Sequence, residues 1–106
     1  MTPGDRYDRL VEQVADTGRI WLLEDEAGLV GSEDDEGRRY LAVWPDEAPA
    51  AACAVGAWKG ARPVSMDVHP ALETIAARDG MLAAYPTPDD EGVLVAAAEL
   101  QRRLVD

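Results

Sequence analysis

The sequence contains few of the side chains on which small enzymes and metalloproteins depend. Its 106 residues include one cysteine, Cys53, one histidine, His69, a single lysine and no phenylalanine. One cysteine excludes an intrachain disulfide, and one cysteine with one histidine cannot supply the several soft ligands of a usual zinc site. Phosphate-binding loops, dinucleotide fingerprints, metalloprotease helices and nucleophile elbows are also missing. The sequence therefore predicts no cofactor, no metal site and no catalytic residue.

Long apolar runs are absent as well. Nothing approaches the ~20 consecutive apolar residues that a membrane-spanning helix needs. Residues 1–7 lack the apolar core of a signal peptide. We therefore expect a cytoplasmic protein without a membrane partner.

Basic residues are outnumbered by acidic ones. Ten lysines and arginines face twenty-one aspartates and glutamates, so the formal net charge is −11. Such a field repels the phosphates of nucleic acids and anionic membranes, and it attracts a basic protein partner. A highly solvated surface without any such partner is the alternative explanation of the charge.

The residues that are abundant indicate an ordinary globular domain. Hydrophobic residues make up 47% of the chain, many of them alanine, which argues against disorder. No composition shift suggests a linker, so we expect one domain over residues 1–106 with an ordered core from about 5 to 104. Small side chains predict a thin core in which one layer of helices covers one sheet.

Hydrophobic spacing, proline and glycine positions divide the chain into short elements. Helices are predicted over 5–16, 46–56, 67–79 and 97–104, and strands over 20–24, 29–31, 40–44, 63–66, 81–85 and 92–96. The predicted class is α+β, with a single, mainly antiparallel sheet of five or six strands and helices packed on one face.

The residues with chemical potential fit structural roles. Cys53 lies within a run of alanines and is predicted to be a small buried hydrophobe, and His69 lies in the first turn of a helix. The acidic segments 33–36 and 89–91 are each followed by a glycine, but a calcium loop of the EF-hand type needs a glutamate where Val43 and Ala98 stand. Both segments are predicted to be solvated turns.

Trp58 is the best candidate for a binding residue. It follows the glycine that ends a helix, so it lies in a loop, and tryptophan is enriched at interaction hot spots. A lid folded over the edge of the core is the alternative. With Asp34, Asp35 and Glu36 of the first acidic turn, Trp58 forms the predicted partner-binding set.

Short segments spread along the chain form an ordered set of features: 21–23, Asp25, Gly28, 41–46, Trp58, 66–68, Leu72, 85–86 and 92–95. This ordered set, from Tyr7 to Leu104, resembles the bacterial domain-of-unknown-function family numbered 2750. The resemblance implies a small α+β domain and carries no catalytic residue. A looser similarity to SseB-type domains is one of fold only.

Together these features favour a non-enzymatic domain that binds a basic protein partner, in an immunity-like or regulatory role. The alternative is a small enzyme or ligand-binding domain with a shallow, carboxylate-lined pocket. A mimic of nucleic-acid charge is a third hypothesis, and it requires the acids to line one face. The sequence indicates no particular oligomeric state.

The charge balance generates the first testable prediction, that the protein binds neither DNA nor RNA. Ten dispersed basic residues cannot neutralise a row of phosphates within a repulsive field. Gel shift at low salt is the most demanding test, because low salt favours electrostatic binding. Retarded bands at micromolar protein would contradict the prediction.

Overall fold

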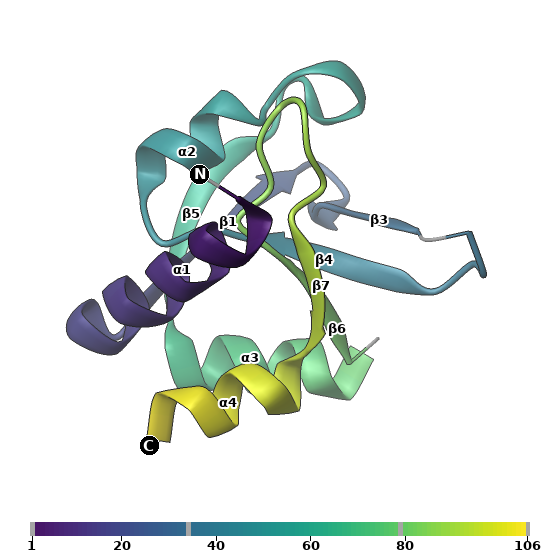
Figure 1. Ribbon diagram of the computed structural model, residues 1–106. Coiled ribbons are helices and arrows are strands. Elements are labelled where there is room, and N and C mark those ends of the chain that lie inside the picture. The colour runs from purple at the N-terminus through teal and green to yellow at the C-terminus, as the bar shows by residue number, and fades with distance from the viewer. Residues whose placement is uncertain (1, 34, 79, 106) are drawn as a thin grey trace.

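The computed structural model describes residues 2–33, 35–78 and 80–105 (Figure 1). Within them the elements follow in the order α1 (Pro3–Thr17), β1 (Arg19–Asp25), β2 (Gly28–Leu29), β3 (Gly31–Glu33), β4 (Arg39–Val43), α2 (Glu47–Ala52), the 3₁₀ turn η1 (Gly56–Trp58), β5 (Arg62–Asp67), α3 (Val68–Arg78), β6 (Met81–Ala84), β7 (Val93–Ala96) and α4 (Ala97–Val105). The α+β class is confirmed.

The strands form two sheets, so the prediction of a single sheet is wrong. One sheet has the order β2-β1-β5 and is antiparallel, and the other has the order β3-β4-β6-β7, with β4 and β6 parallel. Strand β1 and the residue that follows β4 form an isolated antiparallel bridge, in which Trp21 and Trp44 exchange backbone hydrogen bonds of 2.8 Å. Beyond this bridge the two strands diverge, which a pattern of apolar residues does not reveal.

The segment 28–33 fills the fork between the diverging strands. Its β2 half pairs with β1 and its β3 half pairs with β4. At the crossing point the Val30 amide donates to the Leu23 carbonyl at 2.9 Å. Gly31 follows, and a Cβ there would collide with the backbone oxygen of Tyr40. A glycine is needed because the two backbones approach so closely.

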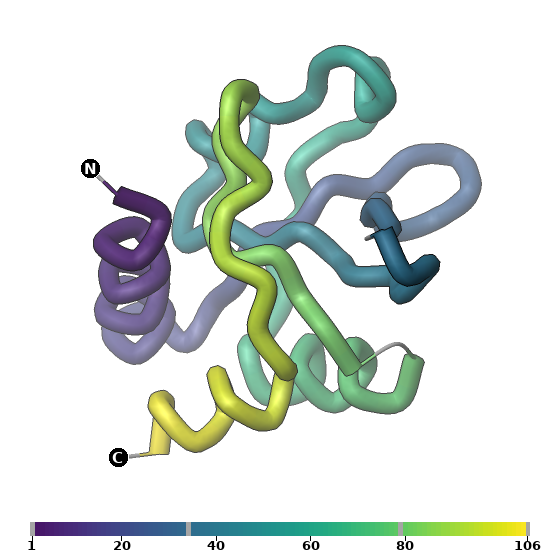
Figure 2. The backbone as a smooth tube through the Cα atoms, turned by 45° about the vertical axis from the view of Figure 1, so that its right-hand side comes forward, coloured from purple at the N-terminus to yellow at the C-terminus, as the bar shows by residue number. Residues whose placement is uncertain are grey.

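Helices cover both faces of the strands, which corrects the prediction that they pack on one face. Neighbouring residues of a strand point to opposite faces, and Leu22 joins one buried cluster whereas Leu23 joins the other. The larger cluster contains residues of α1, α3 and α4. The smaller one contains Ala50 of α2 and Cys53 beside it. Figures 1 and 2 show α3 and α4 together at one end and α2 at the other.

Capping groups close several helix ends, although α1 begins at Pro3 rather than residue 5 and α2 ends at Ala52 rather than near residue 56 as predicted. Thr2 and Asp5 form a reciprocal capping box before α1, the carboxylate of Asp46 accepts from the Glu47 amide at the start of α2, and Gly80 takes the left-handed conformation (φ 75°) after α3. The longest helix has 15 residues, and across the described ranges no helix could span a membrane.

A polar contact ties the first helix to the last. The hydroxyl of Tyr7 in α1 donates to Glu99 in α4 at 2.9 Å, and the Arg103 guanidinium lies 4.8 Å from the Tyr7 ring centre. Burial, followed by the hydrogen bond to Glu99, raises the pKa of Tyr7 to about 12. The phenol therefore keeps its proton, and the hydrogen bond to Glu99, to a higher pH than an exposed tyrosine would.

Replacing Gly31 by alanine tests the fork. Because the added methyl group meets the rigid backbone of β4, we expect Gly31→Ala to lower the free energy of unfolding by about 1–3 kcal/mol. Gly4→Ala in α1 is the control, because the nearest atom to its new Cβ is Thr2 Oγ1 at 3.8 Å. Urea melts that show equal effects for the two variants would contradict the close approach at Gly31.

Candidate functional site

A hollow lies between Trp58 and the loop that joins β6 to β7. Its volume is about 260 Å³, and its lining consists of Trp58 and residues 86–91. Figures 1 and 2 both show this loop rising beside the segment that contains η1. Segments separated by almost thirty residues in the sequence therefore build one surface.

Trp58 is held in place by three contacts. Its side chain is half-buried and packs on the smaller core cluster. Its ring stands edge-on to Trp44, with centroids 6.2 Å apart and an interplanar angle of 90°. The indole nitrogen donates to the Gly31 carbonyl at 3.4 Å, a long hydrogen bond. The predicted lid and the predicted anchor are both compatible with this position, because part of the ring remains accessible.

The wall of the hollow that faces Trp58 is held by hydrogen bonds from core residues. The Pro86 carbonyl accepts from the indole of Trp44 at 2.9 Å and from the thiol of Cys53 at 3.3 Å. Tyr85, just before it, has a left-handed φ of 55°, which is uncommon for a residue with a side chain. Arg6 Nε donates to the Tyr85 carbonyl at 3.0 Å. These buried contacts hold the turn in its strained conformation.

The carboxylates of the loop have different surroundings. Asp90 accepts from the Gly92 amide at 2.6 Å and forms an ion pair of 3.2 Å with Arg6, whose side chain is 10% exposed. The charge of Asp90 is thus compensated by Arg6 within the molecule. Asp89 and Glu91 are exposed, and among the described residues neither forms an ion pair. These two carboxylates beside Trp58 are available to a partner.

The predicted acidic set lies elsewhere. Asp35 and Glu36 belong to the turn between β3 and β4, which projects away from the body of the molecule in Figure 1. Asp34 lies outside the described residues. Glu36 pairs with Arg38 at 3.4 Å, and neither Asp35 nor Glu36 lines the hollow beside Trp58.

The second acidic turn lies beside Trp58 instead, and it was missing from the predicted set. Its only sequence signal was the repeated Asp-Asp-Glu-Gly at 34–37 and 89–92. The repeat does not indicate which of the two acidic turns lies beside Trp58.

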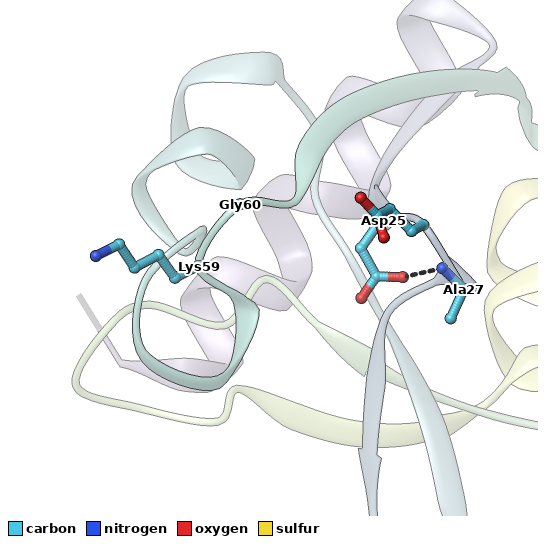
Figure 3. A pocket seen from close by; sticks show the side chains of 5 residues that line it. Asp25, Ala27, Lys59 and Gly60 are labelled. Carbon is cyan, nitrogen blue, oxygen red and sulfur yellow. Dashed lines mark hydrogen bonds between the residues drawn. The ribbon is translucent and has the colours of Figure 1, made fainter.

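A second hollow, of about 310 Å³, contains the only lysine (Figure 3). It lies between the β1–β2 turn and the residues after η1. The carboxylate of Asp25 accepts from the Ala27 amide at 2.8 Å and so closes the turn. The ammonium end of Lys59 points away from Asp25 (Figure 3). The hollow therefore lacks a facing acid–base pair.

The one cysteine and the one histidine of the sequence do not come together. Cys53 is 3% exposed in the smaller cluster, whereas His69 is exposed at the start of α3, which packs on the larger cluster. Within the part of the chain that the structure describes, no three His, Cys, Asp or Glu side chains gather in a way that would hold a metal ion.

Comparison with known proteins gives one match. The sequence profile of a family described as protein of unknown function (DUF2750) matches residues 7–104. No curated protein and no solved structure shows a significant match. The comparisons therefore give no support for the looser similarity to SseB-type domains.

The packing of Cys53 predicts an unreactive thiol. Burial raises its pKa, although the hydrogen bond with Trp44 acts in the opposite sense, and the thiolate is the species that reacts. We expect no labelling by a thiol-specific reagent at neutral pH in the native protein, and one label per chain in denaturant. Labelling of the native protein at the rate of a free thiol such as glutathione would contradict this burial.

Proposed function

The chain belongs to the DUF2750 family of proteins of unknown function, and we propose that it is a non-enzymatic protein-interaction domain with an immunity-like or regulatory role. The partner is a basic protein, and the contact surface is the hollow formed by Trp58 with Asp89 and Glu91. The observation that carries this proposal is the pairing of an accessible indole with two carboxylates that have no ion-pair partner among the described residues.

The chemistry of this surface favours a cationic side chain. A guanidinium or ammonium group gains from the negative face of an indole ring and from charge-assisted hydrogen bonds to carboxylates. The hollow of about 260 Å³ is shallow and suits the end of a protruding side chain rather than a whole small molecule. An arginine of the partner is the best fit, because its planar group both stacks on aromatic rings and binds carboxylates.

The rigidity of the surface supports binding as well. Arg6, Trp44 and Cys53 fix the loop from inside through the Tyr85 and Pro86 carbonyls. A surface that is already ordered loses less conformational entropy when a partner binds. The net charge of −11 adds a long-range attraction that accelerates encounter with a basic molecule.

Binding of a defined basic peptide tests the proposal. The probe is a fluorescent peptide of alternating arginine and serine, measured by anisotropy at low salt. Because Asp89→Asn/Glu91→Gln removes the two accessible carboxylates, we expect it to weaken binding by about fivefold or more, in the range of charged-pair losses. The control, Asp16→Asn/Glu73→Gln, removes the same charge from exposed positions on α1 and α3. Equal losses in the two variants would mean that net charge alone attracts the peptide.

The same variants extend the test to a native partner. Proteins captured from lysate by the wild type and by the control, but not by Asp89→Asn/Glu91→Gln, are the expected result. Neutralising Asp34, Asp35 and Glu36 should mainly slow association and flatten its salt dependence, because the removed charge contributes to the long-range field that accelerates encounter.

Trp58→Ala separates binding from folding. Truncating a fully buried tryptophan costs about 3–5 kcal/mol, and the half-buried Trp58 should cost less. We therefore expect a folded variant that binds the peptide more weakly, with both properties measured by urea melt and anisotropy. A variant that unfolds would place Trp58 with the core and leave the proposal to rest on the carboxylates.

A further inference from the structure

A third hollow is also bordered by Trp58. Its charged lining is mainly positive, whereas the hollow formed by Trp58 and residues 86–91 is lined by carboxylates. The volume of the third hollow is about 410 Å³, and its lining includes Arg39, Arg78 and Trp58 with the backbone around Gly31. No arginine lines the hollow formed by Trp58 and residues 86–91. The same indole therefore borders a carboxylate-lined hollow and a guanidinium-lined hollow.

The parallel pairing of β4 with β6 brings the two arginines together. Leu41 is the register partner of Leu82. Arg39 precedes Leu41 by two residues, and Arg78, the last residue of α3, lies just before the turn into β6. Two cations that are far apart in the sequence thus line the same hollow.

Both guanidinium groups are available. Five of the ten basic side chains form ion pairs within the described residues: Arg6, Arg19, Arg38, Arg62 and Arg103. Arg39 and Arg78 are exposed and form none there. In a chain with twice as many acids as bases, two such arginines at one hollow are a distinct local arrangement.

Two acids of the described ranges that lie near these cations, Glu33 and Asp25, form no ion pair with them there. Glu33 is the register partner of Arg39, yet the described contacts include no ion pair between them. Asp25 also lines the hollow, and its carboxylate accepts from the Ala27 amide. Arg78 lies in the last turn of α3, where its positive charge interacts favourably with the negative end of the helix dipole. This interaction uses none of the five N–H donors of its guanidinium group.

We infer that this hollow binds an oxyanion, a carboxylate or phosphate group, between Arg39 and Arg78. Each guanidinium offers a fork of donors that matches two oxygens of such a group. Trp58 provides an apolar wall for the atoms that carry the anion. The inference stands apart from the proposed contact with a basic partner, because it uses different charged residues.

The surrounding charge limits the affinity of the site. The net charge of −11 repels anions at long range, and that repulsion is screened by salt over about 8–10 Å. A free anion should therefore bind with a dissociation constant on the order of 1 mM, which two charge-assisted contacts on an exposed surface can supply. Added salt competes for the arginines but also screens the repulsion, so titrations need constant ionic strength.

Titration of the labelled protein with inorganic phosphate and, separately, with citrate tests the inference. The observed signal is the indole N–H of Trp58 in a proton–nitrogen spectrum, which is sensitive because that group bonds to Gly31 at the hollow. Arg39→Gln and Arg78→Gln should each weaken binding about tenfold, as expected for loss of a charged contact. Arg102→Gln is the control, because Arg102 is exposed on α4 and forms no ion pair among the described residues.

Saturable binding of either probe that is lost in both hollow variants and kept in Arg102→Gln supports the site. Phosphate alone would identify a phosphate-bearing ligand, and citrate alone a carboxylate-bearing one. Absence of saturation with both probes overturns the inference, as does an affinity unchanged in Arg39→Gln and Arg78→Gln. Asp89→Asn/Glu91→Gln should still bind the anion, so failure of the peptide-binding proposal remains distinguishable.

Discussion

The backbone bridge between Trp21 and Trp44 is the junction on which the architecture depends. It is where two diverging strands touch through a pair of 2.8 Å hydrogen bonds. Each such bond contributes only about 0.5–1.5 kcal/mol net, so two bonds alone do not hold two sheets together. The fork is stable because segment 28–33 satisfies the backbone of both strands beyond the bridge. Helices on both faces then exclude water from it.

Trp44 also connects this junction to the candidate site. Its backbone forms the bridge, its indole donates to the Pro86 carbonyl, and its ring contacts the edge of Trp58. It is fully buried, so each contact is made in a medium where an unpaired polar group is costly. The position of the acidic loop and the position of Trp58 thus depend on the same side chain. Changes in the core next to Trp44 should therefore alter the geometry of the hollow formed by Trp58 and residues 86–91.

Local features of the sequence were predictable because they depend on neighbouring residues. The predicted limits of α1, the start of α2 and the end of α3 are close to those of the structure, whereas α2 ends at Ala52 and not at residue 56. The fork at Gly31 depends on long-range pairing, which sequence spacing does not encode. The sequence also did not predict which face of the strands α2 covers, because the alanine-rich α2 segment has no strongly apolar side. For the proposed site, the sequence pointed to Trp58 as a candidate, but the acidic residues beside it belong to a turn that long-range packing brings there.

The charge arrangement around Trp58 has a consequence for the kind of molecule that fits there. Asp89 and Glu91 line one hollow that Trp58 borders, and Arg39 and Arg78 line another. A uniformly basic segment gains at the first hollow and is repelled at the second, whereas a segment with a cation and an anion at suitable spacing gains at both. The overall negative field accelerates encounter without selecting among basic partners. Under the proposed function, specificity would come from the local alternation of charge, because a partner with the wrong order of charges would meet repulsion at each hollow.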